Sequence, residues 1–251
     1  DVVKPGQIDM DKNKVYQYRK TFDCPQDFIG NKLILSFEGA ESNIYVWLNG
    51  KFIGCSEDSF TPSRFDITKY TQEKDNVLCV RIFQKCTGTW LEDQDMWRFT
   101  GLFRDVMIYK QPSLHIQDLK IDTDIDLDTN KSVLSCVCKM SSNESHTLQA
   151  KLYDPQGNIV WNGNMQDTFE IPVENTCLWS SEFPNLYQLE LVLYDTNNEI
   201  IETIQEQVGF RKFTLEYGIM KLNGKRIVFH GINRHEWDPK TGRSLLPIGA
   251  P

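Results

Sequence analysis

Short β-rich runs separated by turn signals follow one another along the chain, and no segment before residue 110 carries a long helical period. The clearest case places Asn49-Gly50 between the runs at residues 44–48 and 51–55. Asn-Gly in this position is a strong hairpin signal, because both residues tolerate positive φ in a type I′ turn. Closely spaced strands of this kind form antiparallel sandwiches. We therefore predict an all-β chain, with a two-sheet sandwich of jelly-roll type over residues 1–112.

The β pattern restarts after Pro112 and continues for about 100 residues with turn signals between the runs. A stretch of this length and spacing suits an immunoglobulin-like sandwich, although no Cys…Trp…Cys core signature is present. We predict such a sandwich for residues 113–211. The strands expected in the two sandwiches are residues 15–22, 33–38, 44–48, 51–55, 77–84 and 106–109, then 115–121, 132–139, 147–153, 168–171, 187–194 and 199–208.

The last region, residues 212–251, has a different organisation. A second hairpin turn, Asn223-Gly224, precedes an apolar run at residues 227–229, which predicts a buried strand with His230 in the core beside it. The polar run Asn233-Arg234-His235-Glu236 follows. Barrels and open α/β sheets place their sites at the carboxyl ends of buried strands. The region therefore predicts the first strand of a barrel or of an open α/β sheet, with the domain cut off after that strand.

Composition excludes several classes of function. The 251 residues are 40% hydrophobic and 12% aromatic, which suffices for about two domains with cores of their own. A net charge of −8 argues against a nucleic-acid or anionic-membrane surface, since such a surface needs a basic patch. No run approaches the ~18 apolar residues of a membrane span. We expect neither a nucleic-acid nor a membrane partner.

The cysteines are odd in number and show no C-x-x-C spacing of a zinc site. Cys136 and Cys138, two apart on a predicted strand, point to one face and behave as small core residues. We predict reduced, structural thiols, which favours the cytoplasm. The seven are Cys24, Cys55, Cys79, Cys86, Cys136, Cys138 and Cys177.

One stretch, residues 90–98 (Trp-Leu-Glu-Asp-Gln-Asp-Met-Trp-Arg), carries three carboxylates within four residues between two tryptophans. A run that serves only as a solvated face rarely alternates with Trp and Met, because these side chains favour burial. Aromatic rings pack on the C–H faces of sugars, while carboxylates accept hydroxyl protons or hold a cation. The stretch therefore predicts a site for a polyhydroxylated ligand or a cation, with the solvated acidic face as the alternative.

Together with Gly101-Leu102-Phe103-Arg104-Asp105, residues 90–98 resemble the sugar-binding domain of β-galactosidases of glycoside hydrolase family 2. Leu178-Trp179-Ser180-Ser181-Glu182 resembles their immunoglobulin-like second domain. Val208-Gly209-Phe210-Arg211 and residues 231–236 resemble the entry into their (β/α)₈ catalytic barrel. The resemblance implies that residues 212–251 hold the truncated first strand of this barrel, and residues 244–251 do not continue its pattern. The resemblance runs from residue 16 to residue 243. The later motifs are shared with glucuronidases and mannosidases, whereas the Glu-Asp-Gln-Asp-Met-Trp run points to galactosidases.

The resemblance implies roles for two residues. Asp95 matches the aspartate that binds the galactosyl 6-hydroxyl and a sodium ion, and His235 matches a histidine that contacts another sugar hydroxyl. Both residue types suit these roles, since carboxylate oxygens ligate hard cations and a neutral imidazole can both donate and accept. The structural alternatives are an ion pair of Asp95 with Arg98 or Arg104 and a satisfied histidine near a strand end.

Other polar residues near these two receive lesser roles. Asn233, Arg234 and Glu236 are expected to support the site rather than to bind the ligand. Glu92 and Asp93 receive no role.

The resemblance also implies what these 251 residues lack. Retaining glycoside hydrolysis uses two carboxylates about 5 Å apart. In this family both are glutamates on later barrel strands, near the magnesium ligands and the other sodium ligands, and none of those motifs occurs in this sequence. We expect no catalytic residue, an incomplete sodium site and no magnesium site in this chain.

These implications predict the N-terminal portion of a retaining β-galactosidase that hydrolyses terminal β-D-galactosides in carbohydrate metabolism. The parent enzyme is expected to be a homo-oligomer that uses sodium and magnesium, and the portion is expected to be inactive alone. One alternative is a stand-alone carbohydrate-binding or assembly module. The other is a fragment of a β-glucuronidase or β-mannosidase from the same family.

Overall fold

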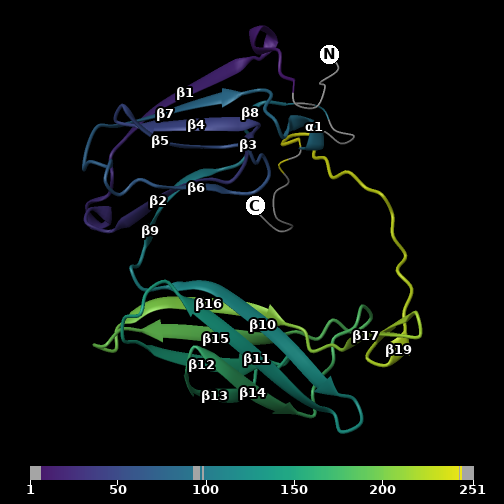
Figure 1. Cartoon of the computed structure of the whole chain (residues 1–251). Helices are drawn as coiled ribbons and strands as arrows, with labels where there is room; N and C mark the ends of the chain where they lie inside the picture. Colours follow the sequence, from purple (N-terminus) through teal and green to yellow (C-terminus); the bar gives the residue numbers. More distant parts are fainter. Residues whose placement is uncertain (1–6, 93–96, 98, 243, 245–251) are drawn as a thin grey trace. The chain divides into compact units, whose positions relative to one another are not determined.

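The computed structural model describes residues 7–92, 97, 99–242 and 244, which fall into two compact units. Unit 1 contains Asp1–Gln111 and Arg234–Pro251, and unit 2 contains Pro112–Asn233 (Figure 1). Both are built from strands, so the predicted all-β class is confirmed. None of the helices among the described residues has the length and apolar composition that crossing a membrane requires.

Unit 1 is a β-sandwich with short helical turns at its margins. One sheet has the order β1-β7-β4-β5 and the other the order β6-β2-β9, with a small pair β3-β8 beside them. The strands are β1 (Val15–Phe22), β2 (Lys32–Phe37), β3 (Ala40–Glu41), β4 (Asn43–Leu48), β5 (Lys51–Ser56), β6 (Ser63–Asp66), β7 (Asn76–Phe83), β8 (Gly101–Leu102) and β9 (Val106–Gln111); the helical turns are η1 (Met10–Lys12), η2 (Gln26–Phe28) and α1 (Thr89–Glu92).

The core of unit 1 follows from the period-two pattern of its strands. Alternate apolar residues of β4 lie opposite those of β7, as in the pairs Val46↔Val80 and Leu48↔Leu78, and all four side chains are buried. The predicted hairpin is confirmed, because β4 and β5 pair across Asn49 and Gly50, whose φ angles are 51° and 76°.

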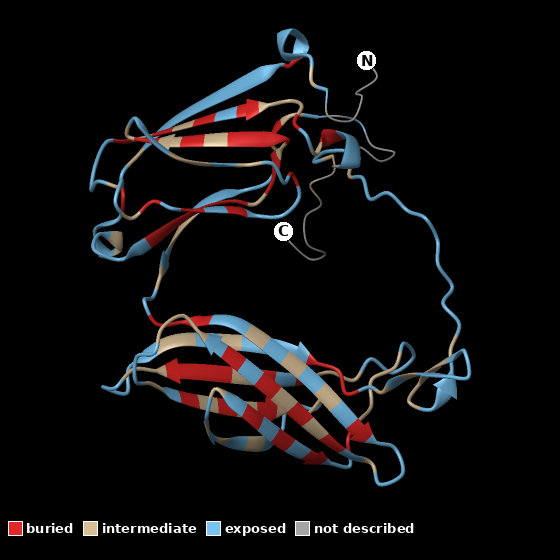
Figure 2. Cartoon of the chain, in the orientation of Figure 1, coloured by how far each residue is buried: buried red, intermediate tan, exposed pale blue. Residues whose placement is uncertain are grey.

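Unit 2 is a second sandwich, of immunoglobulin-like type as predicted. Its two sheets have the orders β10-β11-β14 and β13-β12-β15-β16. The strands are β10 (Ile116–Asp126), β11 (Lys131–Met140), β12 (Thr147–Tyr153), β13 (Ile159–Met165), β14 (Thr168–Glu174), β15 (Tyr187–Tyr194) and β16 (Ile200–Val208). Buried and open residues alternate along β11, β12 and β14 (Figure 2), as expected for strands with one face on a core.

Three motifs of unit 2 meet at Trp179. The guanidinium of Arg211 lies 5.2 Å from the centre of its ring, and Asn223 donates a hydrogen bond of 3.0 Å to its main-chain carbonyl oxygen. A Cβ atom on Gly209 would lie 3.0 Å from the Trp179 ring, closer than most Cβ contacts, so glycine favours this close approach of the chain. These motifs therefore hold the end of the sandwich against the chain that follows it.

The region after residue 212 differs from the prediction. It forms a small antiparallel sheet of β17 (Phe213–Glu216), β18 (Ile219–Leu222) and β19 (Lys225–Arg226). The predicted turn at Asn223-Gly224 is present, with φ angles of 50° and 78°. The predicted buried strand at residues 227–229 is wrong, because this segment has no strand and Val228 and Phe229 are 60% and 71% exposed.

The prediction that His230 lies in the core is also wrong, since its side chain is exposed. Both corrections have one cause. A parallel barrel strand is buried by neighbouring strands and helices, and the described residues contain none that pair with this segment.

Candidate functional site

Glu92 anchors the start of the stretch that the sequence singled out. It ends α1, and its carboxylate accepts two hydrogen bonds from Ser59, at 3.0 Å from the main-chain N–H and 2.6 Å from the hydroxyl. Ser59 is fully buried, so a charged acceptor satisfies a buried donor pair. Glu92, for which no role was predicted, therefore fixes the end of α1 to the body of unit 1.

Arg104 anchors the far end of the same stretch. Its guanidinium donates to the main-chain carbonyl oxygens of Glu38 at 3.2 Å and Phe60 at 2.8 Å, and it lies over the ring of Phe103 at 5.2 Å. The motif Gly101–Asp105 is thereby tied to the chain after β2 and to the loop between β5 and β6. Arg104, one of the two arginines considered as ion-pair partners, is thus held by carbonyl oxygens.

Three aromatic side chains gather where this stretch meets the end of the chain. The ring of Trp97 packs edge-on against Trp237 at 5.4 Å between centroids, and Phe99 stacks on Trp237 at 5.8 Å with 30° between the planes. All three remain partly open, with Trp97 72%, Phe99 42% and Trp237 44% exposed. Aromatic faces that stay open in a cluster are well suited to pack on the C–H faces of a sugar.

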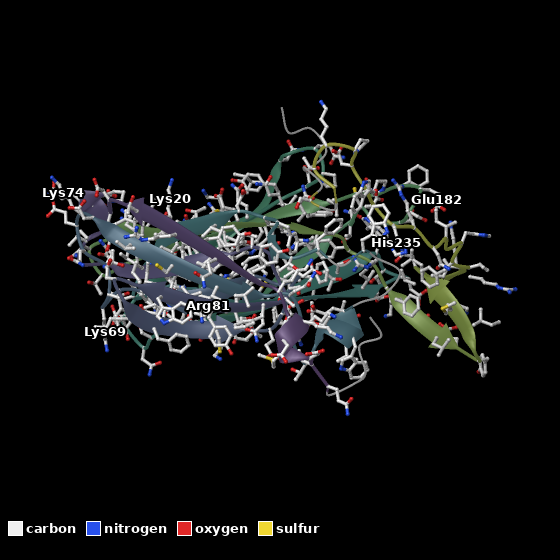
Figure 3. All side chains as sticks on the ribbon, turned by 90° about the horizontal axis from the view of Figure 1, so that it is seen from above. Lys20, Lys69, Lys74, Arg81, Glu182 and His235 are labelled. Carbon is white, nitrogen blue, oxygen red and sulfur yellow. The ribbon has the colours of Figure 1, made fainter. Side chains whose placement is uncertain are left out.

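His235 lies two residues before Trp237, on the strandless segment after β19, and its side chain is exposed (Figure 3). Its neighbours Arg234 and Glu236 form an ion pair of 2.8 Å, and the guanidinium of Arg234 also donates a hydrogen bond of 2.9 Å to the Glu236 carboxylate. Because Trp237 contacts Trp97 and Phe99, the segment that carries His235 belongs to unit 1 together with residues 90–98. The two stretches predicted to form the site are therefore brought to one unit.

A tight turn holds Trp237 in place. The Asp238 carboxylate accepts from the main-chain N–H groups of Lys240 at 2.7 Å and Thr241 at 2.8 Å, and Asp238 forms an isolated bridge with Gly242. Gly242 has a φ of +65°, which glycine adopts without strain. The N–H groups of Thr241 and Lys240 keep the pKa of Asp238 below its ordinary value, so the turn is intact at neutral pH.

Asp95, Asp93 and Arg98 lie outside the described residues. The expected sodium ligand and its alternative ion pair with Arg98 are therefore still predictions. Within the described part of the chain, no three His, Cys, Asp or Glu side chains gather closely enough to hold a metal ion. The site that the structure does describe is an aromatic cluster with His235 beside it in sequence.

Two contacts of the candidate site were missed by sequence reasoning. Trp237 was not singled out, although an aromatic residue directly after the His235-Glu236 pair is a signal that could have been weighed. The partnership of Ser59 with Glu92 left no signal, because the two residues are 33 positions apart and no pattern pairs them.

Comparison with known proteins gives three consecutive matches to family models. The sugar binding domain of glycosyl hydrolases family 2 matches residues 2–112, and the model described as glycosyl hydrolases family 2 matches residues 114–211. The TIM barrel domain of the same family matches residues 213–246. The three matches cover almost the whole chain in the order that the family has.

Curated relatives match over nearly the full chain but are much longer. A β-galactosidase of Halalkalibacterium halodurans is 45% identical over 248 residues, which are 96% of this chain and 24% of the relative. The β-galactosidase large subunit of Leuconostoc lactis is 41% identical over 98% of this chain and 40% of its own length. The chain thus spans about a quarter to two fifths of these relatives.

Solved structures share the fold at low sequence identity. A β-glucuronidase from Ruminococcus gnavus superimposes with a TM-score of 0.80 at 21% identity, covering 96% of this chain and 44% of the solved one. A β-glucuronidase from Bacteroides uniformis gives 0.78 at 23% identity, covering 93% and 31%. At this identity the likeness establishes the fold alone.

Proposed function

Because this chain belongs to glycosyl hydrolases family 2, we propose that it is the N-terminal portion of a retaining β-galactosidase that hydrolyses terminal β-D-galactosides. The observation that carries the proposal is the set of relatives named β-galactosidase, which are 38–45% identical over at least 92% of the chain. The Glu-Asp-Gln-Asp-Met-Trp run at residues 92–97 supports the same choice within the family.

In this proposal the chain supplies one wall of the sugar pocket. Asp95 binds a galactosyl hydroxyl and, through a carboxylate oxygen, a sodium ion, while His235 contacts a second hydroxyl. A sodium ion bound there would ligate hydroxyl oxygens of the sugar and so fix the position of the sugar. The open rings of Trp97, Phe99 and Trp237 offer apolar faces to the sugar C–H groups.

The chemical step is assigned to residues outside this chain. Two carboxylates about 5 Å apart are needed for retention, and the family's glutamate motifs do not occur in these 251 residues. We expect the purified chain to leave a chromogenic β-galactoside intact, and magnesium to be bound by the rest of the parent enzyme. Turnover that a β-galactosidase inhibitor abolishes would contradict this assignment.

A chimera tests the substrate. The chain is fused to the part of the Halalkalibacterium β-galactosidase that follows the matched region, and hydrolysis of β-galactosides and β-glucuronides is compared. We expect β-galactoside hydrolysis. A folded chimera that leaves β-galactosides intact would contradict the galactosidase proposal.

Two substitutions in the chimera test the site. Asp95→Ala and His235→Ala should each lower kcat/KM by about 10- to 100-fold, the range expected for a hydrogen bond to a charged group or its equivalent. Asp118→Ala, at an exposed position of unit 2, serves as the control and should leave the rate unchanged. Equal effects of the site and control substitutions would contradict the assignment of Asp95 and His235 to the sugar pocket.

The alternative function is a stand-alone sugar-binding module. The partly exposed rings of Trp97, Phe99 and Trp237 would also suit such a module. Calorimetry of the chain with galactose separates the two proposals. One wall of a pocket should bind too weakly to detect, whereas a binding module should give a measurable affinity that Asp95→Ala lowers.

We also propose that the parent is a cytoplasmic oligomer. All seven cysteines, each within the described part of the chain, are free thiols, which suits a reducing compartment. Some relatives are named large subunits, which implies assembly from more than one chain in those proteins. Light scattering of the full-length parent would test the oligomeric state, and a monomer would contradict it.

A further inference from the structure

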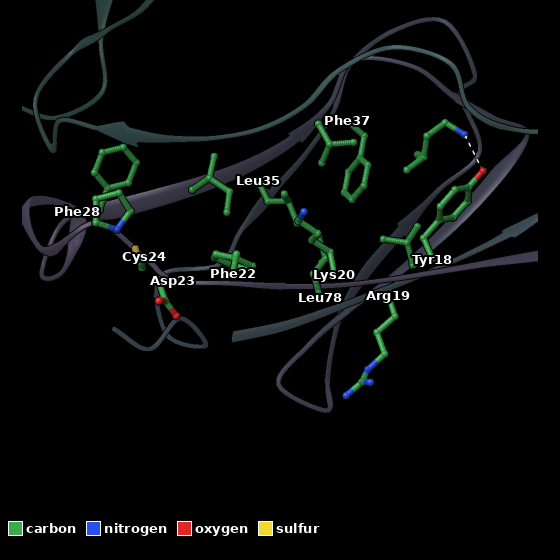
Figure 4. A pocket seen from close by; sticks show the side chains of 15 residues that line it. Tyr18, Arg19, Lys20, Phe22, Asp23, Cys24, Phe28, Leu35, Phe37 and Leu78 are labelled. Atoms are coloured by element: carbon green, nitrogen blue, oxygen red, sulfur yellow. Dashed lines mark hydrogen bonds between the residues drawn. The ribbon is translucent and has the colours of Figure 1, made fainter. Parts of the chain in front are cut away.

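The four-stranded sheet of unit 1, with the order β1-β7-β4-β5, has one side on the core and one side away from it. Along β7 buried side chains alternate with more exposed ones, and the more exposed set lies opposite its counterparts on β1 and β4. Figure 4 shows the side chain of Arg19, a member of this set, pointing away from Leu35 and Phe37 of the core. We call this side of the sheet the outer face, and its members include Gln17, Arg19, Trp47, Cys79 and Arg81.

A hollow of about 490 Å³ lies on the outer face and is lined by these five residues together with Tyr18 and Val80. Sites for small organic ligands have volumes of about 300–1,000 Å³. β7 lies between β1 and β4, so its main-chain hydrogen bonds are made within the sheet. A ligand in this hollow is therefore recognised by side chains, and an added peptide strand would find no main-chain partner at β7.

Trp47 forms the apolar wall of the hollow and belongs to an aromatic cluster. The centroid of its ring lies 6.2 Å from that of Tyr45, with 20° between the planes, and 5.6 Å from that of Phe52. Tyr45 in turn meets Phe83 edge-on at 5.6 Å. Trp47 stays partly exposed. A ring that is fixed by its neighbours and open to solvent is well suited to contact the C–H groups of a sugar.

Two guanidinium groups lie beside this ring. That of Arg81 lies 5.6 Å from the centre of the Trp47 ring, and both Arg81 and Arg19 are exposed. Arg19 pairs with Cys79, two residues before Arg81, so the two arginines are diagonal neighbours, about 7–8 Å apart at the main chain. Their long side chains can therefore reach one anion, and a guanidinium binds carboxylate and phosphate groups through two parallel hydrogen bonds.

The sheet is positively charged although the chain is acidic. The strands β1, β4, β5 and β7 contain no Asp or Glu, and their charged residues are Arg19, Lys20, Lys51 and Arg81. By contrast, the whole chain has 35 acidic and 27 basic residues. Because the two arginines of the hollow repel each other, a bound anion would lower the electrostatic energy of this face. Its charge therefore favours an anionic ligand.

We propose that the outer face binds a small anionic saccharide, whose carboxylate or phosphate group is held by Arg19 and Arg81. C–H groups of the sugar contact Trp47, and the carboxamide of Gln17, which both donates and accepts, contacts its hydroxyl groups. None of these residues belongs to the stretches 90–98 and 231–237 of the candidate galactoside site. The proposal does not depend on which glycoside the parent cleaves.

Calorimetry of the purified chain tests the ligand class. Glucose 6-phosphate and galacturonate are the anionic sugars, and glucose, galactose and inorganic phosphate are the matched controls. At least one anionic sugar should bind with a Kd below about 1 mM, and the controls should bind at least about 10-fold more weakly. Which of the two binds more tightly identifies the source of the anion as a phosphate or a uronate. Binding of neither, or equal binding of a control, would overturn the proposal.

Substitutions of arginine locate the anion. Arg19→Gln and Arg81→Gln should each weaken the anionic sugar by about 10-fold or more, the range for a hydrogen bond between charged groups. Arg64→Gln makes the same change at an exposed position of β6, outside the outer face, and should leave the affinity within about 2-fold. Equal effects of the three changes would overturn the assignment to the outer face.

Nuclear magnetic resonance of the unsubstituted chain covers the case in which a variant fails to fold. The anionic sugar should shift the amide signals of Arg19, Cys79 and Arg81. Shifts confined to the candidate galactoside site would overturn the proposal. So would tighter binding of a glutamate peptide than of either anionic sugar, or self-association of the chain through the outer face.

Discussion

Glu92 accepts two hydrogen bonds from Ser59, at 2.6 Å from the hydroxyl and 3.0 Å from the main-chain N–H. The contact joins the last residue of α1 to the chain between β5 and β6, so it fixes the first three residues of the 90–98 stretch on unit 1. A residue with no apparent role in the sequence is thus the anchor of the predicted site.

Glu92→Ala should destabilise unit 1, because it leaves the buried Ser59 donors without an acceptor. An unsatisfied buried donor costs about 1–3 kcal/mol, and Glu92→Gln should cost less since its amide oxygen still accepts. Urea unfolding followed by tryptophan fluorescence measures the change. Glu73→Ala at an exposed position of unit 1 is the control, and a loss equal to that of Glu92→Ala would contradict the anchoring role.

The strands could be predicted from the sequence where the pattern is local. The hairpin at Asn49-Gly50 and the alternation in β12 depend on residues that are neighbours in the chain, and both are present as predicted. The strand β13 was missed because its run contains Asn162, Gly163 and Asn164. β13 is stabilised by pairing with β12, and the residue pattern of a single strand does not show which strand it pairs with.

The site was predictable only in part, for a related reason. The aromatic and acidic residues near Asp95 share one stretch, so their chemistry can be read from the sequence. Trp237 joins Trp97 and Phe99 across about 140 positions, and only the folded chain brings them together. The burial of residues 227–229 was wrongly predicted because apolar periodicity indicates a buried strand without indicating which neighbours bury it.

Trp237→Ala should loosen the segment around His235. Its ring contacts with Trp97 and Phe99 contribute about 0.5–1.5 kcal/mol each, so their loss should raise the rate of tryptic cleavage at Arg234 and Lys240 by about 2- to 10-fold. Cleavage rates are read by mass spectrometry.

Phe229→Ala is the matched control for this experiment, because Phe229 precedes the same segment and is 71% exposed. It should leave cleavage at both sites unchanged. If Trp237→Ala has as little effect as the control, the aromatic cluster does not hold the segment.

The cysteines should differ sharply in reactivity. Burial raises the pKa of Cys136 to about 12, and the neighbouring Cys138 thiol adds to this effect. Burial raises the pKa of Cys138 to about 11, and the Asp167 carboxylate adds to this effect. At pH 8 about one Cys136 thiol in 10,000 is ionised, and only the thiolate reacts. Cys55 is exposed.

Iodoacetamide at pH 8 should therefore label Cys55 first and Cys136 at least about 100-fold more slowly until the chain is unfolded. Peptide mapping by mass spectrometry follows each site, and Cys55→Ser should remove the fast phase. Comparable rates for Cys55 and Cys136 in the folded chain would show that β11 opens readily.

Gly101 should tolerate no side chain. Its φ is +121°, and a Cβ atom there would lie 2.5 Å from the hydroxyl oxygen of Tyr18. Gly101→Ala should cost about 1–3 kcal/mol in the free energy of unfolding. A Cβ atom on Gly88 would meet no atom of the described chain closer than 3.8 Å, so Gly88→Ala should stay within about 0.5 kcal/mol. Equal losses in urea unfolding would contradict the conformational argument.

His146 of unit 2 faces acceptors on both sides of its ring. Nδ1 lies 2.9 Å from the carbonyl oxygen of Glu144, and Nε2 lies 2.8 Å from a carboxylate oxygen of Asp167. Neither partner can donate, so both ring nitrogens must carry a proton to make both bonds. The Glu144 carbonyl, followed by the Asp167 carboxylate, raises the pKa of His146 above its ordinary value of 6.5, while burial opposes them.

A raised pKa in the folded state makes stability depend on pH with a defined sign. The contribution of His146 is fully present below pH 6.5 and is lost as pH rises through the raised folded pKa. The melting temperature of unit 2, followed by circular dichroism, should therefore fall above pH 6.5, and His146→Gln should flatten this fall. His230→Gln, at an exposed position, should keep it. A fall that persists in His146→Gln would assign the pH dependence to other groups.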